Sequence, residues 1–588
     1  MNIAYIDIKN FRGISNARIY LSNHTVLIGD NNAGKSTILE AIDLVLGPER
    51  LNKIPVVDEH DFFNGAYHNE AGGSPQIEIE LLVVGLADEQ QRRFMNNIEF
   101  WNEETKSILP EDSIIEVDKP NIIPALRVKF IGLYDPEEDD FIGDTYFCSP
   151  VLDSEQPLSK FRRSDKRECG FLYLRAIRTG ARALSMERGS LLDIILRLRE
   201  IRPKMWEDVL NQLRATAVAT DPSSGMNEIL SGVQKALKDF VPTDWGAEPH
   251  LKVSDLTREH LRKTLTIFMS TGDGTYHAPF QHQGTGTINT MVLALLTMIG
   301  EAKKNVIFAM EEPEIAIPPY TQKRIINSIC KKSSQAIFTS HSPFVLEEFA
   351  PEKIVLIQRD KLGLTKSQAV HLPKNIKPKN YNSEFRLRFS ESLLAKRVLL
   401  CEGATEVISY LSAGRRLNEL NEAKYSSLEA MGIAVFDVRT DSEISAYGDY
   451  FSKLEKTVFA VFDKQSAEDL NKIKTSVKYP YESKYQGFED LLLSETDSDI
   501  LKEYYNNLIT EKIWPTHLDS IIPADPMDIE EIKVALKGYL RWSKGSNTAS
   551  ELISMCTSET QIPETLRTVL IDIKNKVELK EPVENEGV

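Results

Sequence analysis

Residues 29–37 read Gly-Asp-Asn-Asn-Ala-Gly-Lys-Ser-Thr, and the organisation of the whole chain follows from this stretch. It comes after the apolar run 25–28 and leads into a helix-like segment at 36–46. The pattern is G-x-x-x-x-G-K-S between a strand and a helix, the context of a phosphate-binding loop rather than of a chance glycine-rich turn. Its glycines allow backbone N–H groups to face phosphate oxygens at the positive end of a helix. We predict ATP binding by Asn31, Asn32, Gly34, Lys35, Ser36 and Thr37.

Two side chains of this loop have specific expected tasks. Lys35 should reach the β- and γ-phosphates, and the Ser36 hydroxyl should bind Mg²⁺.

Composition describes an ordinary globular protein. At 588 residues the chain should form several domains, and 41% of its residues are apolar. The net charge of −17 disfavours binding of nucleic acid through overall charge, although a local basic groove or bound metal ions would still permit it. The five cysteines are scattered without C-x-x-C spacing, which indicates neither zinc nor disulfides. No apolar run approaches membrane-helix length and no signal peptide is evident, so we expect a cytoplasmic protein without membrane contact.

Two further apolar runs place acidic and imidazole groups at strand ends. The run 305–310 ends in Glu311 and Glu312, and the run 335–340 ends at His341. Glu311 is expected to orient Mg²⁺ or its waters, and Glu312 to position or deprotonate the attacking water. His341 is expected to contact the γ-phosphate.

The order of these motifs resembles the ATP-binding-cassette heads of the SMC and RecF type. The motifs are K-N-F-R-G at 9–13, the phosphate loop, E-E-P-E at 311–314 and T-S-H-S-P at 339–343. The resemblance implies two heads enclosing two ATP molecules, each site completed by a signature loop of the other head. Residues 283–287 stand in the place of that loop but read Q-G-T-G-T, where the family has S-G-G-Q.

A second group of carboxylates follows further apolar runs. Glu402 ends the run 397–401, Glu406 lies four residues later, and Asp463 ends the run 457–462. Carboxylates at the carboxyl ends of parallel strands suit Mg²⁺ or Mn²⁺.

The stretch L-L-C-E-G-A-T-E at 399–406 resembles the first motif of a Toprim domain. An ATP-binding-cassette head followed by a Toprim domain is similar to the OLD (overcoming lysogenization defect) family of endonucleases, which includes the Gabija nuclease subunit. This resemblance implies that Glu402, Glu406, Asp463 and Glu489 are metal ligands. It also implies that Lys544, in Y-L-R-W-S-K, is a late catalytic lysine beside the catalytic Glu402.

The family's D-x-D motif reads Asp463-Lys464-Gln465 here, so one carboxylate is missing. A glutamine offers only a neutral carbonyl oxygen. A one-metal nuclease, an altered substrate and a silenced catalyst all remain open. Asp437 or Asp441 would be able to compensate.

The expected fold is α/β, with an SMC/RecF-like ATPase head, a helical insertion and a Toprim domain with C-terminal helices. The expected domains are the first part of the head (1–185), a dimerising helical insertion (186–245), the second part of the head (246–375) and the Toprim domain (390–580).

These expectations lead to an ATP-regulated, metal-dependent DNA endonuclease acting in antiphage defence. Its partners would be DNA, a second copy or higher homo-oligomer, and a further defence component, either protein or nucleic acid. The alternative is a RecF-like DNA clamp with an impaired Toprim domain. A topoisomerase or primase is disfavoured because no strand-end tyrosine nucleophile or zinc module is recognisable.

Overall fold

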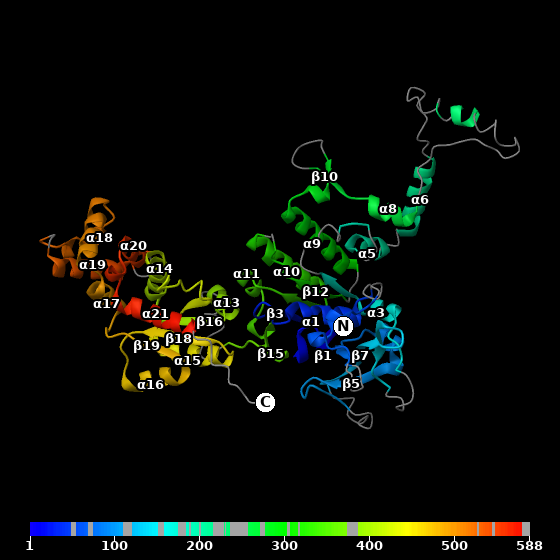
Figure 1. Ribbon diagram of the computed structural model, residues 1–588, viewed down its shortest axis with the longest axis horizontal. Helices are drawn as coiled ribbons and strands as arrows, with labels where there is room; N and C mark the ends of the chain where they lie inside the picture. Colours follow the sequence, from blue (N-terminus) through cyan, green and yellow to red (C-terminus); the bar gives the residue numbers. More distant parts are fainter. Residues whose placement is uncertain are drawn as a thin grey trace. The chain divides into compact units, whose positions relative to one another are not determined.

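The chain folds into two compact units, Met1–Val370 (the N-terminal unit) and His371–Val588 (the C-terminal unit). Figure 1 shows the computed structural model, with helices and strands labelled along the chain. The structure describes residues 1–48, 55–68, 75–109, 120–150, 158–174, 184–186, 190–198, 202–215, 229, 231–235, 257–270, 277–302, 306–315, 318–372, 386–525, 528–543 and 547–578.

The N-terminal unit is built on one mixed sheet of 13 strands. Its parallel part runs in the order β14 (Ile354–Arg359), β3 (His24–Ile28), β13 (Gln335–Thr339), β12 (Ile307–Glu311) and β9 (Phe171–Leu174). These strands are continuous apolar runs, which is typical of parallel strands that are covered on both faces. Their carboxyl ends carry the phosphate loop, the E-E-P-E turn and the S-H-S-P turn.

Residues 354–357 belong to β14, the last strand of the parallel part of the sheet. Strand β14 lies inside the sheet, between β3 and β15 (Leu364–Ala369). The mainly polar β15 follows β14 along the chain. It pairs antiparallel with β14 and parallel with β2 (Ile14–Tyr20), and so joins the two parts of the sheet.

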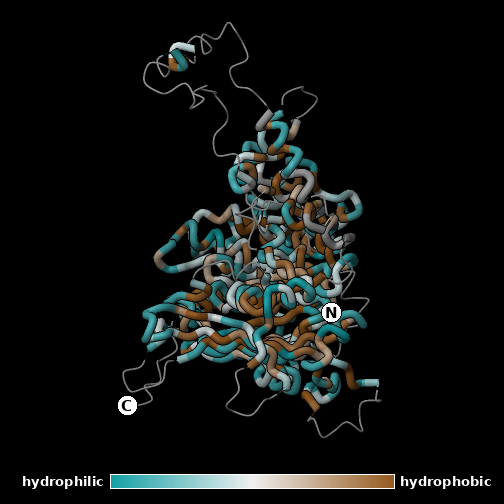
Figure 2. Tube along the Cα trace, turned by 90° about the vertical axis from the view of Figure 1, so that its right-hand side faces the viewer, coloured by the Kyte–Doolittle hydropathy of each residue, from teal (hydrophilic) through white to brown (hydrophobic). Residues whose placement is uncertain are grey.

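The antiparallel part of the sheet comprises β1 (Asn2–Phe11), β2, β4 (Ile77–Val84) and β7 (Ile122–Asp135). Alternate residues face the core, where they pack with helix α1 (Lys35–Leu46). In Figure 2 the apolar segments gather inside the fold and hydrophilic segments lie along its outside. The remaining strands of this sheet are β5 (Ile98–Asn102), β6 (Ser107–Ile108) and β8 (Asp140–Phe147).

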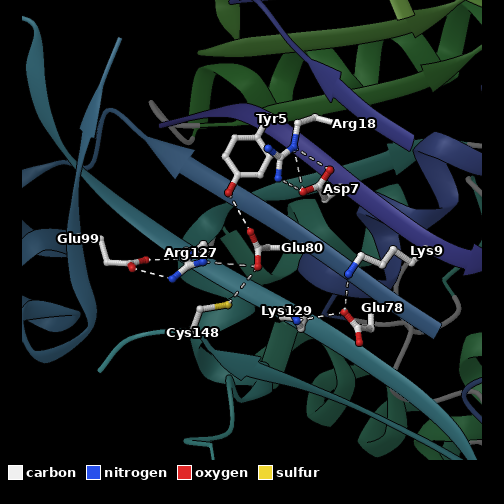
Figure 3. Close-up of polar contacts among 10 residues, drawn as sticks. All are labelled: Tyr5, Asp7, Lys9, Arg18, Glu78, Glu80, Glu99, Arg127, Lys129 and Cys148. Atoms are coloured by element: carbon white, nitrogen blue, oxygen red, sulfur yellow. Dashed lines mark hydrogen bonds and ion pairs between the residues drawn. The ribbon is translucent and has the colours of Figure 1, made fainter. Parts of the chain in front are cut away.

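The opposite face of these strands carries ion pairs of alternating sign (Figure 3). Arg127 pairs with Glu99 at 2.8 Å and with Glu80 at 3.7 Å, and Lys129 pairs with Glu78 at 3.2 Å. Each cation drawn in Figure 3 has a carboxylate partner, so positive and negative charges are paired on this part of the face.

Helices surround the sheet of the N-terminal unit, and none of the described helices of the chain is both long and apolar enough to cross a bilayer. Half of the predicted dimerising insertion (186–245) lies outside the described residues. Trp206 and Leu210 of α6 pack with Leu261 of α8 in a small separate core. The helices other than α1 are α2 (Asp88–Arg93), α3 (Arg163–Cys169), α5 (Leu191–Leu198), α6 (Arg202–Ala215), α8 (Arg258–Thr264), α9 (Thr285–Ala302), α10 (Pro319–Lys332) and α11 (Pro343–Leu346), beside a hairpin of β10 (Phe268–Ser270) and β11 (His277–Pro279).

The C-terminal unit contains a four-stranded parallel sheet, in the order β17 (Ile433–Asp437), β16 (Arg397–Cys401), β18 (Thr457–Phe462) and β19 (Tyr479–Glu482). Strands β16 and β18 correspond to the apolar runs 397–401 and 457–462 of the sequence. Since all four strands are parallel, their carboxyl ends share one edge. The helices are α13 (Arg386–Leu394), α14 (Ala404–Leu420), α15 (Asp441–Lys453), α16 (Ala467–Ser476), α17 (Phe488–Glu495), α18 (Ser498–Thr510), α19 (Ile529–Trp542), α20 (Thr548–Met555) and α21 (Glu564–Glu578).

Candidate functional site

The loop between β3 and α1 has the backbone shape that the sequence pattern requires. Gly29 has φ +148°, Asn32 +68° and Gly34 +99°, conformations that favour glycine or asparagine. A Cβ at Gly29 would lie 2.2 Å from the carbonyl oxygen of Ile357 in β14, so only glycine fits there. Asn31, Asn32 and Ser36 are exposed in this loop and at the start of α1, and Thr37 is half-buried.

Lys35 is folded over the loop. Its Nζ donates to the carbonyl oxygens of Gly29 and Asp30, both at 2.9 Å. Burial lowers the pKa of Lys35, against the opposing charges of Glu312, Asp30 and Glu314. A cation therefore lies inside the loop, with carboxylates of the neighbouring strand end near it.

The structure brings the E-E-P-E and S-H-S-P turns together because their strands are neighbours. Glu311 lies opposite Thr339 in the β12–β13 register, and the Glu312 N–H donates to the Thr339 carbonyl at 2.9 Å. Burial and the charge of Lys35 lower the pKa of His341, while Glu312 acts in the opposite direction. Lys35, Glu312 and His341 are thus close enough to influence one another electrostatically.

Glu312 has φ +42°, a left-handed conformation that is uncommon for a residue with a side chain. Such backbone strain concentrates at functional sites. Glu311, one residue earlier, accepts a hydrogen bond from the Tyr173 hydroxyl of β9.

Sequence reasoning assigned no role to Glu314, the last residue of E-E-P-E. Its Oε1 accepts hydrogen bonds from the His341 N–H at 2.7 Å and from the Ser340 hydroxyl at 3.0 Å. The Ser342 hydroxyl of the same turn donates a hydrogen bond to Oε1 of Gln322 in α10 at 2.9 Å. Burial raises the pKa of Glu314. Glu314 therefore ties one turn to the other.

Arg12 of the K-N-F-R-G stretch also received no role from the sequence. Its Nε donates to Asp61 at 2.8 Å, and its Nη1 pairs with Glu40 of α1 at 2.7 Å. Arg12 and Asp61 line a cavity of about 510 Å³, together with Gly13 and residues 58–65. Because Arg12 lines the cavity and pairs with Glu40 of α1, the cavity lies near the helix that begins at the phosphate loop.

In the C-terminal unit, Glu402 and Asp463 follow β16 and β18, which are neighbours. The backbone N–H of Asp463 donates to Oε2 of Glu402 at 3.2 Å. Glu406 is buried in the first turn of α14, and a Cβ at Gly403 would lie 2.9 Å from its Oε2. Burial, then the charges of Glu406 and Asp437, raise the pKa of Cys401. The carboxyl edge of this sheet is therefore acidic.

Gln465 stands where the D-x-D motif has its second carboxylate. Its neighbour is Glu482, at the end of β19, which the sequence did not indicate. Glu482 lies opposite Phe462 in the register, and its Oε1 accepts the Gln465 N–H at 2.9 Å. Glu406, Asp463 and Glu482 line a cavity of about 20 Å³, room for about one water molecule.

The predicted metal ligands are not gathered into one shell. Within the described ranges, no group of three or more His, Cys, Asp or Glu side chains is arranged to hold a metal ion. Glu489 lies in the first turn of α17, beside Asp490, which pairs with Lys537 of α19. As a donor set, carboxylates at one sheet edge suit a hard divalent cation. The predicted catalytic Lys544 lies outside the described residues.

Comparisons with known families divide the chain in the same order as the motifs. Residues 1–167 match the description "AAA ATPase domain", and residues 184–347 match "AAA domain, putative AbiEii toxin, Type IV TA system". Residues 393–464 match "Overcoming lysogenization defect protein-like, TOPRIM domain". That last match includes Glu402, Glu406 and Asp463.

Three curated relatives share this organisation at low identity. The Old nuclease of Escherichia phage P2 is 24% identical over 460 residues, covering 72% of each chain. The OLD nuclease of Thermus scotoductus is 25% identical, covering 70% of this chain and 74% of its own. Endonuclease GajA of Bacillus cereus is 21% identical, covering 88% of each chain.

A solved SMC head bound to the C-winged helix domain of ScpA covers 64% of this chain at 15% identity, but its TM-score of 0.35 is too low to support an assignment. The family matches and the curated relatives confirm the resemblance seen in the motifs. With ATPase matches followed by an OLD-like Toprim match, the chain is similar to the OLD nucleases along most of its length.

Proposed function

We propose that this protein is an ATP-binding and ATP-hydrolysing, Mg²⁺- or Mn²⁺-dependent DNA endonuclease that acts in antiphage defence. The observation that carries the nuclease assignment is the hydrogen bond from the Asp463 N–H to Glu402. It places the Glu402 carboxylate against the backbone of Asp463, at the carboxyl edge of a parallel sheet and within the OLD-like Toprim match.

The ATP site would use the residues already gathered at the phosphate loop. Lys35 would leave the carbonyl groups of Gly29 and Asp30 to bind the β- and γ-phosphates, and Ser36 would hold Mg²⁺. Glu311 would orient the ion's waters, Glu312 would position the attacking water, and His341 would contact the γ-phosphate. The cavity beside Arg12 offers room for the nucleoside.

At the Toprim edge, Glu402, Glu406 and Asp463 would hold a divalent cation, with Glu489 as a later ligand. When bound, such an ion stabilises charge on the phosphoryl oxygens and makes a bound water more acidic. The protein's own part is to present carboxylate oxygens from adjacent strands and to bury Glu406, which limits its access to water. Lys544 would stabilise charge on the phosphate or leaving oxygen.

The alternative is a RecF-like, ATP-driven DNA clamp whose Toprim domain binds without cutting. The observation in its favour is Gln465, whose amide donates to the Asp463 carbonyl at 3.2 Å. The Gln465 side chain is thus neutral and donates a hydrogen bond, whereas the family motif has an acid at this position.

Nicking of supercoiled plasmid distinguishes the two functions. We expect the wild-type protein to nick in Mg²⁺ or Mn²⁺, and Glu402→Ala to abolish nicking while ATP hydrolysis persists. Glu419→Ala is the matched control, because Glu419 is an exposed carboxylate on α14 with a local partner, Arg416. Unchanged nicking by Glu402→Ala would refute the metal-site assignment. Binding of DNA by the wild-type protein without nicking in either metal would favour the clamp.

The proposed homodimer, or higher oligomer, and a further protein or nucleic-acid partner rest on the SMC-like head and on the relatives' family. Light scattering with and without ATP tests the oligomer, and survival of phage-challenged cells carrying wild-type or Glu402→Ala protein tests the defence role.

A further inference from the structure

Asp437, at the carboxyl end of β17, is a buried carboxylate that is held by arginine residues. It is 7% exposed, and its Oδ2 pairs with Nη1 of Arg388 at 3.3 Å. Its Oδ1 accepts the backbone N–H of Arg439 at 2.8 Å. A buried charge needs such compensation, because desolvation without a partner is costly. Asp437 therefore fixes two arginine residues at one place in the fold.

That place is the edge of the sheet that carries the proposed nuclease site. Asp437 lies opposite Cys401 in the β16–β17 register, and Cys401 immediately precedes Glu402. The Val438 N–H also donates to the Cys401 carbonyl at 2.9 Å. Glu402 follows β16, which lies between β17 and β18. Asp463 therefore lies at the end of the strand on one side of Glu402, and Asp437 at the end of the strand on the other.

Arg388 projects from α13 and remains accessible despite its ion pair. Its side chain is 53% exposed, whereas that of Asp437 is 10% exposed. A guanidinium has five N–H donors in a planar fork that matches phosphate geometry, so an ion pair through Nη1 leaves donors facing solvent. Arg439 is also exposed.

We propose that Arg388 is a substrate-phosphate-binding residue of the Toprim site, and that Asp437 is the positioning residue that holds it there. This inference rests on the proposed function and identifies part of its substrate contact. An acidic edge in a chain of net charge −17 repels a polyanion, so a cation held at the neighbouring strand end would help to attract a backbone phosphate to this edge.

The same contacts decide the role of Asp437. The sequence left open that Asp437 replaces the missing D-x-D carboxylate as a metal ligand. In the structure both of its carboxylate oxygens already accept hydrogen bonds, one from Arg388 and one from Arg439. A cation at this carboxylate would have to displace a guanidinium.

The test is binding of a fluorescein-labelled DNA duplex to the full-length protein, followed by fluorescence anisotropy in Ca²⁺ over a range of salt concentrations. We expect Arg388→Gln to weaken binding about tenfold and to reduce the slope of log Kd against log salt by about 0.9, the loss of one phosphate contact. Arg388→Lys should keep the slope and recover part of the affinity. Asp437→Asn should keep the slope, with a smaller loss of affinity and a higher KM for nicking.

The matched control is Arg415→Gln. Arg415 of α14 pairs with Glu429, which precedes the amino end of the same strand β17, and its side chain is 64% exposed. This variant should leave DNA affinity and salt slope unchanged. Thermal denaturation of every variant separates loss of a contact from loss of folding.

Wild-type affinity and slope in Arg388→Gln, or a lowered Tm as its only change, would overturn the inference while leaving the proposed nuclease intact. Loss of Mn²⁺ binding in Asp437→Asn, measured by calorimetry, would make Asp437 a metal ligand and overturn its positioning role. Absence of both DNA binding and nicking in the wild-type protein would overturn the proposed function, and this inference with it.

Discussion

The carboxylate of Glu314 accepts a hydrogen bond from the backbone N–H of His341 at 2.7 Å. This contact joins the ends of two adjacent strands, β12 and β13, across the site that faces Lys35. The carboxylate also accepts from the Ser340 hydroxyl, so a single side chain holds two successive residues of the S-H-S-P turn.

Glu314→Ala should lower ATP turnover more than ATP affinity, because His341 loses its fixed position while the phosphate loop is untouched. The orphaned N–H and hydroxyl should destabilise the N-terminal unit by about 1–3 kcal/mol. Steady-state ATPase kinetics and denaturation measure the two effects. Glu352→Ala, at an exposed carboxylate of the same unit, is the control. A proportional loss of affinity and turnover would contradict this role.

Glu312→Gln should reduce ATP turnover by about 10² or more, with ATP affinity changed only a few-fold. The substitution keeps the shape of the side chain and its backbone hydrogen bond to Thr339 but removes the group expected to act on the attacking water. Phosphate release and nucleotide binding by calorimetry measure the two quantities. Turnover close to that of the wild-type protein would exclude Glu312 as the base.

Arg12→Ala should destabilise the N-terminal unit by about 3 kcal/mol, since Asp61, with 3% of its side chain exposed, loses its ion-pair partner. Arg18→Ala provides a comparison in the same unit, because Arg18 of β2 pairs with Asp7 of β1 but is 55% exposed (Figure 3). Arg18→Ala should lower the free energy of unfolding by less than about 1 kcal/mol. Urea denaturation of both variants measures the difference. Equal losses of unfolding free energy would show that burial does not determine how much these ion pairs stabilise the unit.

Lys166 makes stability depend on pH. Burial lowers its pKa to about 8, and its Nζ donates to the Leu44 carbonyl at the end of α1, at 2.8 Å. Between pH 8 and about 10.4 the unfolded chain retains a proton at this lysine that the folded chain has released. The free energy of unfolding should therefore gain a contribution that rises with pH through this window, by at most about 1.4 kcal/mol per pH unit.

Lys166→Met should remove that rising contribution, while Lys361→Met, at an exposed lysine, should retain it. Denaturation at pH 7.5, 8.5 and 9.5 checks the slopes. A slope for Lys166→Met equal to that of the wild-type protein would mean that this amine keeps its ordinary pKa.

The parts of the fold that could be predicted are those encoded locally. The apolar runs before the phosphate loop, E-E-P-E and S-H-S-P became β3, β12 and β13, because a run of buried side chains bounded by turn residues indicates a parallel strand. By contrast, β19 contains Pro480 and polar neighbours, which suit an edge strand but give no apolar run, so Glu482 was missed.

The contacts that define the sites could not be predicted in the same way, because they join residues far apart in sequence. Glu314 lies 27 residues from His341, and Arg388 lies 49 residues from Asp437. The sequence shows which strands end in charged groups, but strand order and register decide which of these groups meet. It therefore identified Glu402 and Asp463 correctly as strand-end acids, yet it could not place Arg388 beside Asp437.

Gly403 gives the acidic edge a steric requirement in addition to its charges. A methyl group at this position would lie 2.9 Å from Oε2 of Glu406, inside normal contact distance. Even alanine there would push a buried carboxylate aside without altering any ionisable group. The shape of this acidic edge thus depends on the lack of a side chain at Gly403, one residue after the acid that we propose to be essential.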